Sequence, residues 1–326
     1  MVRFGIIGTS WITDEFIRCA GLTGDFILSG VYSRTAGRAR EFAEKYGVKK
    51  IFTDLEEMSQ SQFIDAVYIA SPNSFHAPQA LIMLNGKKHV LVEKPAASNA
   101  RELAAMIDAA RKNRVVLMEA LKTTLLPNFQ TVRDNLSRIG QVRRFLTIKC
   151  QYSSRYDRYK QGLPTNTFNP ELANGSLMDI GVYCLYPIMA LFGRPSSIRA
   201  NAVMLESGID GEGSVCLQYD GMEAVAIHSK IADSGLPSEI QGEQGNIIID
   251  KISTPEKVEI VYKGGAVEDI TRDQSPDLMY YEAREFIDLI QKGRLESTIN
   301  NHQLSLEVMK VMDEARRQIG LRFPAD

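Results

Sequence analysis

The first 120 residues alternate short apolar runs with stretches of helical periodicity, and this rhythm restricts the fold more than any other feature of the chain. Strands that are separated by helices of this length form a parallel sheet whose two faces are covered by right-handed crossovers. The expected strands are residues 2–8, 26–33, 65–71, 89–95 and 115–120, and the expected helices are about Ile12 to Ala20 and residues 36–47, 76–86 and 99–113. We therefore predict a doubly wound α/β parallel sheet.

After about Leu121 the rhythm changes. Segments that alternate or run apolar between turn signals, with few helices among them, are typical of a mostly antiparallel sheet. These segments are residues 142–154, 196–205, 213–220, 223–231, 245–251 and 257–265, and two amphipathic helices follow at 280–293 and 304–320. The sequence therefore predicts two domains, residues 1–120 and an α+β domain of residues 121–326.

The charge balance restricts the class of partner. Thirty-eight basic and 40 acidic residues give a net charge of -2, so the chain has no basic surplus for nucleic acid or an anionic membrane. The apolar stretch from Ile180 to Phe192 is too short to cross a bilayer, and the N-terminus has no signal-peptide pattern. We expect a small-molecule partner, no nucleic acid and no membrane.

The four cysteines, Cys19, Cys150, Cys184 and Cys216, are widely spread. Their spacing predicts neither a zinc site nor a disulfide framework, and no metal is required by any other motif. A reducing cytoplasm is the location that fits this usage.

The turn after the first strand has the position of a dinucleotide-binding fingerprint, because Gly5 and Gly8 lead directly into the first helix. Read from Gly8 the pattern is G-x-S-x-x-T, with Ser10 and Thr13 where glycine or alanine is more usual. Ser10 is small and can donate a hydrogen bond to phosphate. The residues predicted to hold the pyrophosphate are Gly8, Thr9, Ser10, Trp11 and Ile12. The alternative is an ordinary strand-to-helix turn.

The second strand ends in Tyr32-Ser33-Arg34, and Arg38 follows. No Asp or Glu stands where an acid would bind the ribose 2′-hydroxyl of NAD, whereas a serine with an arginine suits a 2′-phosphate. Ser33, Arg34 and Arg38 therefore predict NADP, with NAD less favoured. The alternative is that Arg34 only begins a surface helix.

Glu93-Lys94-Pro95 follows the apolar run 89–92 and precedes a helical pattern. Ligands of open α/β sheets bind outside the carboxyl ends of the strands, so a lysine at this edge can act on a bound substrate or cofactor. Pro95 has no N–H and disfavours helical dihedrals at Lys94, which keeps the chain extended. An isolated Lys-Pro pair is more often an ordinary strand end.

Residues 174–183 carry a second set of chemical groups. A helix from about Leu177 places Asp179 and Tyr183 on one face, four residues apart. The tyrosine hydroxyl can exchange a proton with a carbonyl or alcohol oxygen, and an ammonium such as Lys94 favours its ionised form. The alternative is a helix-start anion beside a half-buried core tyrosine. Pro187 predicts a kink or break in this helix.

Taken together, the ordered motifs FGIIGTS, SR, SPNSFH, EKP, MEA and NGSLMDIGVYCL resemble those of the glucose-fructose oxidoreductase, inositol dehydrogenase and rhizopine catabolism (Gfo/Idh/MocA) family over essentially the whole chain. The likeness is greatest to the branch with glucose-fructose oxidoreductase and dimeric dihydrodiol dehydrogenase, because Tyr183 stands where many members carry histidine. Asn174 and Ser176 interrupt the usual glycine run. Lys122 replaces an aromatic residue of the dihydrodiol branch, which argues against an aromatic diol substrate.

The resemblance implies a Rossmann dinucleotide-binding domain at 1–120 and a substrate-binding and oligomerisation domain at 121–326, whose large open sheet builds a homodimer or higher homo-oligomer. It implies that Lys94 and Tyr183 are the catalytic pair and that Asp179 holds substrate. The residues that it places beside the cofactor are Ser71, Asn73, His76, Glu93 and Lys94.

Two hypotheses of function remain at this point. The first is an NADP-dependent oxidoreductase that transfers hydride between nicotinamide and a CH–OH or C=O group of a sugar, polyol or diol, with reduction of a conjugated double bond or imine as a variant. In this hypothesis Tyr152 to Tyr159, with Arg155, line the substrate surface. The second is a non-catalytic NADP-sensing regulatory or scaffold protein, since a fold does not fix a function.

Overall fold

The computed structural model describes residues 1–326, which form two compact units. Unit 1 comprises Met1–Lys122 and Ser275–Ser305, and unit 2 comprises Thr123–Gln274 and Leu306–Asp326. The predicted boundary at residue 120 lies within two residues of the first change of unit. Residues 275–305, in contrast, group with unit 1, whereas the sequence placed them in the second domain. The roles given to the two predicted domains stay predictions.

Unit 1 is built on a six-stranded sheet in the order β3-β2-β1-β4-β5-β6, in which every pair is parallel. The prediction of a doubly wound parallel sheet is confirmed. The strands are β1 (Val2–Ile7), β2 (Phe26–Tyr32), β3 (Ile51–Phe52), β4 (Ala66–Ile69), β5 (His89–Glu93) and β6 (Leu117–Ala120). The strand order reverses between β1 and β4, so the carboxyl ends of these strands border the crevice where such sheets bind ligands.

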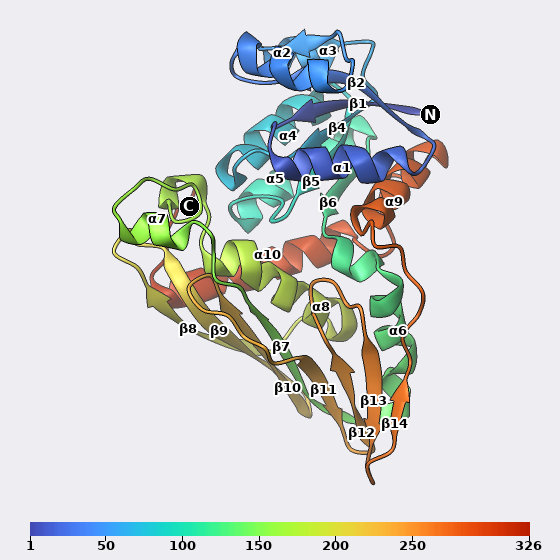
Figure 1. Ribbon diagram of the computed structural model, residues 1–326, viewed down its shortest axis with the longest axis vertical. Helices are drawn as coiled ribbons and strands as arrows, with labels where there is room; N and C mark the ends of the chain where they lie inside the picture. Colours follow the sequence, from blue (N-terminus) through green and yellow to red (C-terminus); the bar gives the residue numbers. More distant parts are fainter. The chain divides into compact units, whose positions relative to one another are not determined.

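Helices cover both faces of this sheet (Figure 1). They are α1 (Trp11–Gly21), α2 (Ala36–Lys45), α3 (Leu55–Gln60), α4 (His76–Asn85), α5 (Ala100–Asn113) and α9 (Met279–Gln291), with the short 3-10 turn η1 (Asn73–Phe75) before α4. Asparagine and aspartate cap several of them; Asn99, for example, accepts a hydrogen bond from the amide of Glu102 at the start of α5. Helices α4 and α5 pack together, and α1 packs against α9.

An aromatic core explains why α9 belongs to unit 1. Phe16 of α1 stacks on Tyr68 of β4 with ring centroids 3.8 Å apart. Phe286 of α9 lies 5.9 Å from Phe4 of β1, and both side chains are fully buried. The apolar face of α9 therefore completes the core of the first sheet, although residues Thr123–Gln274 of unit 2 lie between the two along the chain.

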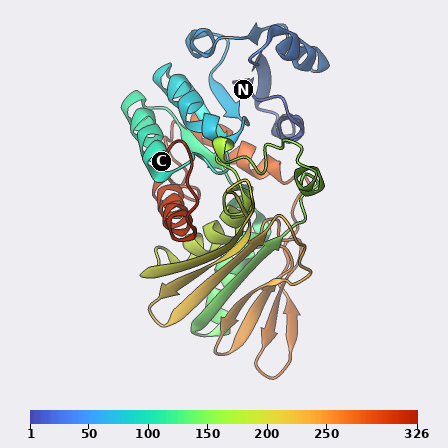
Figure 2. The ribbon, with the colours of Figure 1, turned by 90° about the vertical axis from the view of Figure 1, so that its left-hand side faces the viewer.

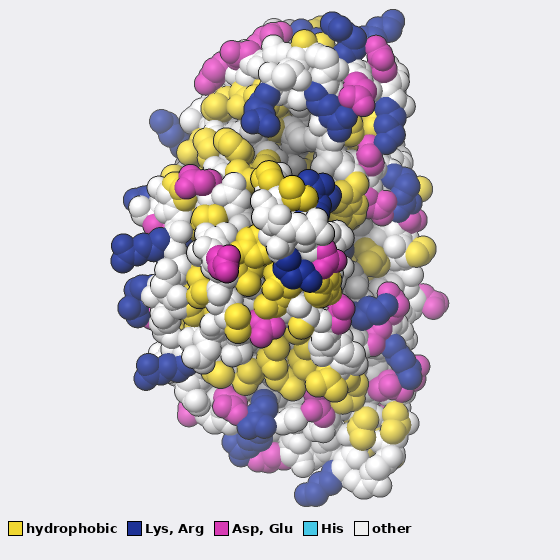
Figure 3. Space-filling model, turned by 60° about the vertical axis from the view of Figure 1, so that its left-hand side comes forward, with side chains coloured by type: hydrophobic (Ala, Val, Ile, Leu, Met, Phe, Trp, Pro, Cys, Tyr) yellow, Lys and Arg dark blue, Asp and Glu magenta, His cyan; other side chains and the backbone are white.

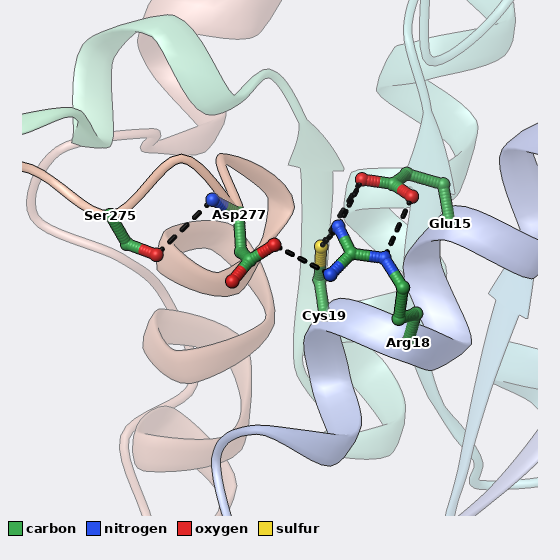
Figure 4. Close-up of polar contacts among 5 residues, drawn as sticks. All are labelled: Glu15, Arg18, Cys19, Ser275 and Asp277. Carbon is green, nitrogen blue, oxygen red and sulfur yellow. Dashed lines mark hydrogen bonds and ion pairs between the residues drawn. The ribbon is translucent and has the colours of Figure 1, made fainter.

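A polar cluster also ties this late segment to α1 (Figure 4). The Arg18 guanidinium donates to Glu15 on its own helix at 2.6 Å and to Asp277 at 2.5 Å. The amide of Asp277 in turn donates to the hydroxyl of Ser275. Cys19 lies beside the guanidinium, and burial raises the pKa of its thiol to about 11, so the thiol stays protonated.

Unit 2 is built on an eight-stranded sheet in the order β14-β13-β12-β11-β7-β10-β9-β8 (Figure 1, Figure 2). Only β7 and β10 pair in parallel, which confirms the prediction of a mostly antiparallel sheet. The strands are β7 (Val142–Cys150), β8 (Ser197–Met204), β9 (Asp210–Tyr219), β10 (Met222–Ser229), β11 (Ser238–Gly242), β12 (Gly245–Ile249), β13 (Val258–Tyr262) and β14 (Val267–Asp269).

Helix α8 (Val182–Phe192) packs against β7 and β10 and covers one face of this sheet. The remaining helical elements are α6 (Pro127–Asn135), α7 (Tyr156–Lys160), the 3-10 turns η2 (Lys122–Leu125), η3 (Leu136–Ile139) and η4 (Pro170–Leu172), the π-turn η5 (Leu177–Gly181), and α10 (His302–Ile319). The first turn of α10 groups with unit 1 and the rest of it with unit 2.

Of the kink or break expected at Pro187, the break does not occur. Helix α8 continues through Pro187 to Phe192, and the irregular turn lies before it, at Leu177–Gly181. The sequence shows that Pro187 removes one backbone donor, but it does not show that the helix packs against β7 and β10 along the sheet.

The helical stretch Pro170–Phe192 is by length and composition alone long and apolar enough to cross a membrane, and it begins ten residues before the segment from Ile180 to Phe192 that the sequence singled out. Its most apolar part is 72% buried inside the protein, as in the core helix of a globular domain.

The sequence missed several short elements, namely β3, α3, α6, β11 and β14. β3 has two residues and β14 has three, too few for a periodic pattern. β11 reads Ser-Glu-Ile-Gln-Gly, and only Ile240 is a buried apolar residue in it. Pairing with neighbouring strands, which the local sequence does not encode, decides the three strands β3, β11 and β14.

Candidate active site

The turn between β1 and α1 is shaped for a close backbone approach. Gly8 has a φ of +107°, and a Cβ there would lie 2.5 Å from the carbonyl oxygen of Ala70, so a larger residue does not fit. Thr13 is buried, and its hydroxyl donates to the Gly8 carbonyl at 3.0 Å. Thr13 thus braces the turn from the helix, at the position where the fingerprint usually has glycine or alanine.

The start of α1 suits an anion. Ser10 is the N-cap, and its side chain makes no capping hydrogen bond to the helix. Trp11, the first helical residue, is 75% exposed. The amides of a first helical turn have no partner within the helix and carry partial positive charge, so this turn fits a pyrophosphate group. The five residues predicted to bind it, 8–12, all lie in this turn.

The three residues predicted to bind the 2′-phosphate, Ser33, Arg34 and Arg38, differ in their contacts. Ser33 follows β2 and is half-buried, and Arg34 is exposed beside it. Arg38 of α2 donates to the hydroxyl and the carbonyl of Thr9, at 3.1 and 2.8 Å, and pairs with Glu41. Arg38 therefore links the second helix to the phosphate turn, while Arg34 is the cation at the strand end.

His76 joins the loop after β4 to residues 94–96, which follow β5 and are called the lysine loop below. This side chain is 1% exposed, and its Nδ1 and Nε2 lie 2.9 and 2.8 Å from the carbonyl oxygens of Pro95 and Ser71. Burial lowers the pKa of His76, while the two carbonyls oppose that shift by favouring the doubly protonated ring. Ser71 also donates to Gln79, and Asn73 begins η1. Direct contact of Ser71, Asn73 and His76 with a cofactor stays a prediction.

Lys94 follows β5, and the groups around its backbone are buried. The carboxylate of Glu93 accepts a hydrogen bond from the Tyr68 hydroxyl at 2.6 Å and one from the Lys94 amide at 3.2 Å. The Lys94–Pro95 peptide bond is cis. Glu119 of β6 accepts a hydrogen bond from the amide of Ala96 at 3.0 Å, and burial raises the pKa of Glu119 to about 7.

A second buried acid lies in the same unit. Glu282 of α9 is 1% exposed, and burial raises its pKa to about 8, with the negative charge of Glu93 adding to the shift and Lys122 opposing it. The sequence gave no sign of this residue, because Glu282 sits in an ordinary amphipathic helix pattern. Its proximity to Glu93 places three acids, Glu93, Glu119 and Glu282, in the region of the lysine loop.

In unit 2 the predicted chemical residues lie on a π-turn. The amide of Val182 donates to the carbonyl of Leu177, five residues earlier, and such turns occur often at functional sites. Asp179 lies within this turn and Tyr183 lies at the start of α8, and both side chains are half-buried. The structure thus confirms helical backbone around them, with an i→i+5 turn in place of the expected regular helix.

Two lysines of unit 2 contact these residues, and the sequence singled out neither. The Lys230 ammonium forms an ion pair with Oδ2 of Asp179. Lys149 of β7 has its Nζ 5.3 Å from the centre of the Tyr183 ring and donates to the hydroxyl of Ser253 at 2.9 Å. Each lysine stands two residues after a buried strand residue, Thr147 in β7 and His228 in β10, and so continues the row of inward-pointing side chains. A lysine is unusual in such a row, and this is the signal that could have found both residues.

Strands β9 and β10 fix the beginning of the π-turn. Asp210 accepts a hydrogen bond from the amide of Leu177 at 2.6 Å, and the hydroxyl of Ser176 lies 2.9 Å from Nδ1 of His228. Burial raises the pKa of Asp210 to about 7 and lowers that of His228 to about 3, so this histidine is neutral near pH 7. Gly175 has a φ of +113° beside Asp210, which a residue with a Cβ would not tolerate.

The aromatic residues expected to line a substrate surface pack largely on one another. Tyr156 lies 5.5 Å from Tyr152 and 5.6 Å from Phe168 between ring centres. The Tyr152 hydroxyl donates to Asp157 and accepts from Lys160. Contact of these rings, or of the exposed Arg155, with a substrate stays a prediction.

The sheet of unit 1, its glycine turn and the helix start beside it define a dinucleotide-binding protein, and the second sheet adds a separate unit that carries Asp179 and Tyr183. Comparison with known proteins defines the family. Residues 2–121 match the oxidoreductase family with an NAD-binding Rossmann fold, and residues 129–248 match the GFO/IDH/MocA C-terminal domain. The chain belongs to the Gfo/Idh/MocA family of oxidoreductases, as the sequence motifs predicted.

Full-length relatives support the assignment. The chain is 55% identical over 326 residues to the scyllo-inositol 2-dehydrogenase (NADP(+)) of Bacillus subtilis, and the match covers 100% of this chain and 99% of that protein. It is 31% identical over 342 residues to the trans-1,2-dihydrobenzene-1,2-diol dehydrogenase of Danio rerio, with 100% and 99% covered.

A solved structure shows the same fold over nearly the whole length. The 3-ketoreductase KijD10 of Actinomadura kijaniata, solved with TDP-benzene and NADP, superposes with a TM-score of 0.84 at 21% identity and covers 98% of both chains. The predicted activity class, a nicotinamide-dependent oxidoreductase acting on CH–OH or C=O groups, is confirmed by these relationships.

Proposed function

We propose that this protein is an NADP-dependent dehydrogenase of a cyclic polyol of the inositol class. The observation that carries the proposal is the 55% identity, over the full length, to an NADP(+)-dependent scyllo-inositol 2-dehydrogenase. The cofactor named for that relative agrees with the preference for NADP that Ser33 and Arg34 predict. The lower identity to dihydrodiol dehydrogenases agrees with the argument from Lys122 against an aromatic diol.

The residues of unit 1 suit the cofactor part of this function. The backbone of residues 8–12 would hold the pyrophosphate, since Gly8 permits the close approach and the α1 amides favour an anion. Ser33 and Arg34 would bind the 2′-phosphate, and Arg38 would hold Thr9 in place. When bound, the nicotinamide supplies or accepts the hydride.

The protein's own side chains handle the proton. In oxidation Tyr183 takes the proton of the reacting hydroxyl, and in reduction it returns a proton to the forming alkoxide. The Lys94 ammonium stabilises the negative charge that develops on that oxygen. Asp179 accepts a hydrogen bond from a second hydroxyl of the polyol and orients the ring. These three roles are proposals that rest on the family resemblance and on the type of each side chain.

The decisive experiment follows the absorbance of reduced nicotinamide while scyllo-inositol, other inositol stereoisomers, aldoses and vicinal diols are added to the protein with NADP. We expect turnover with at least one inositol and slower turnover with NAD. Tight NADP binding with no turnover on any polyol would instead support the sensing or scaffold protein.

We also propose that the protein forms a homodimer or higher homo-oligomer through the face of the large sheet opposite α8. On this face apolar side chains are half-buried or exposed in neighbouring strands, among them Leu146, Val225 and Cys216. Figure 3 shows hydrophobic side chains gathered over the sheet in the lower half of the picture. Sedimentation should give a mass above that of one chain, and Leu146→Asp with Val225→Asp should reduce it.

A cytoplasmic location stays part of the proposal. It accords with the four cysteines, all of which are free thiols in the structure.

A further inference from the structure

Strand β10 and the residue after it present two polar side chains to the π-turn. His228 and Lys230 are two positions apart, so they point to the same face of the sheet. His228 contacts Ser176 before the turn, and Lys230 contacts Asp179 inside it. The chain remains paired at Lys230, whose amide donates to Gly211 at 2.8 Å and whose carbonyl accepts from Ser153 at 2.9 Å. The lysine therefore projects from a fixed backbone.

The burial of Lys230 differs from that of its partner. The Lys230 side chain is 8% exposed, whereas the Asp179 side chain is 33% exposed. A covered ammonium needs a carboxylate or several acceptors close to it, because the loss of water is otherwise too costly. A lysine in this position cannot move its charge into solvent, as an exposed lysine does, while the carboxylate still reaches the surface.

Two other acids of this region, Asp210 and Glu212, have their own hydrogen-bond partners. Asp210 is fully buried, its Oδ2 accepts the hydrogen bond from the amide of Leu177, and burial raises its pKa to about 7. Glu212, in the next part of β9, accepts a hydrogen bond from the hydroxyl of Ser229. Asp179 is thus the carboxylate that pairs with Lys230, and its side chain is partly exposed, four residues before Tyr183.

We propose that Lys230 is a positioning residue that, through its ion pair, holds the Asp179 side chain turned to accept a hydrogen bond from a polyol hydroxyl next to the reacting carbon. The inference rests on the proposed function and assigns to Lys230 the selection of substrates that carry such a neighbouring hydroxyl. Lys230 itself does not touch the reacting atoms. Its effect on turnover passes through Asp179.

A double-mutant cycle tests this, with the intact protein, NADP and the inositol that the wild type oxidises best. Lys230→Met removes the charge at similar length, and Asp179→Asn removes the carboxylate. Each variant is expected to lower kcat/KM roughly 10- to 100-fold, the size of a lost hydrogen bond to a charged group, chiefly through KM. The kcat/KM of the double variant is expected to lie within about threefold of that of Asp179→Asn. Once the carboxylate is gone, Lys230 has nothing to position, so its removal should add little.

Controls separate this role from a structural one. Lys257→Met is the matched control, because Lys257 also pairs with a carboxylate of the sheet, Glu259 at 2.7 Å, but is 55% exposed. It should keep wild-type kcat/KM within about twofold, as exposed ion pairs contribute little. The dissociation constant for NADPH should not change in any of these variants.

Wild-type kcat/KM in Lys230→Met, or effects of the two substitutions that multiply in the double variant, would overturn the inference. If Lys230→Met does not fold, the comparison of the double variant with Asp179→Asn still decides, because removing both charges leaves no unpaired ion. A further loss of more than about tenfold in the double variant then counts against the inference. A wild type inactive on every polyol would instead contradict the proposed function.

Discussion

The lysine loop of unit 1 and the π-turn of unit 2 are both held by buried titratable groups, but in different ways. In unit 1 His76 and Glu119 contact the backbone on the carboxyl side of Lys94, at the carbonyl of Pro95 and the amide of Ala96. In unit 2 Lys230 contacts the side chain of Asp179 directly. The first arrangement holds the backbone, and the second pairs a lysine with the side chain of a carboxylate. Substitutions should therefore have different consequences in the two regions.

The largest effect is expected at the two residues proposed as catalytic, one in each unit. Lys94→Ala and Tyr183→Phe should each lower kcat by roughly 100-fold or more, the size of lost acid–base catalysis. Tyr183→Phe should keep the wild-type dissociation constant for NADPH, which fluorescence titration measures. Near-normal turnover in Tyr183→Phe would remove this residue from the mechanism.

The next effect tests whether unit 1 selects the cofactor. Arg34→Ala should weaken NADPH binding by roughly tenfold and leave NADH binding unchanged. The reason is that the arginine is expected to pair with the 2′-phosphate, which only NADPH carries. Arg40→Ala is the control, since Arg40 is also exposed on the following helix. Equal losses for both cofactors would contradict the assignment, as would tighter binding of NADH than NADPH by the wild type.

A smaller effect should show whether Glu119 acts by accepting the backbone hydrogen bond of Ala96 or through its negative charge. Glu119→Gln keeps an oxygen that can accept from the Ala96 amide, so kcat should stay within about threefold of wild type. Glu119→Leu removes the acceptor and should lower kcat by roughly tenfold. If Glu119→Gln is as damaging as Glu119→Leu, the charge of Glu119 matters and the contrast between the two units fails.

The smallest effect is on stability, and it has opposite signs in the two units. Burial raises the pKa of Glu119 from 4.5 to about 7, so its contribution to stability is present below about pH 4.5 and is lost as the pH rises through about 7. Burial lowers the pKa of His228 from 6.5 to about 3, so its contribution is present above about pH 6.5 and is lost as the pH falls through about 3.

Thermal unfolding at about pH 5 and about pH 8 measures both. Glu119→Gln resembles the protonated acid, so its Tm relative to wild type should rise by about 2 °C or more from the lower pH to the higher. The Tm of His228→Asn relative to wild type should fall from the lower pH to the higher, because the asparagine cannot take up the proton that the unfolded histidine binds at the lower pH. Parallel changes in the two variants would show that one of the two burial effects is absent.

The sequence alone predicted the type of both sheets and named the candidate site residues. Apolar periodicity is local, so the βαβ rhythm and the alternation after Leu121 were readable without coordinates. Gly8, Lys94, Asp179 and Tyr183 could be named because each stands next to a strand end or a helix start, where ligand chemistry is expected. The order of motifs then identified the family.

Only the tertiary structure decided what surrounds those residues. The contacts of Lys230 with Asp179, of Lys149 with Tyr183 and of Glu119 with Ala96 join positions 23 to 51 residues apart. Phe286 enters the core of the first sheet from the far end of the chain. A single sequence records which residues are apolar and where turns fall, but burial and pairing across such separations arise from packing, and burial sets the pKa values of Glu119, Asp210 and His228.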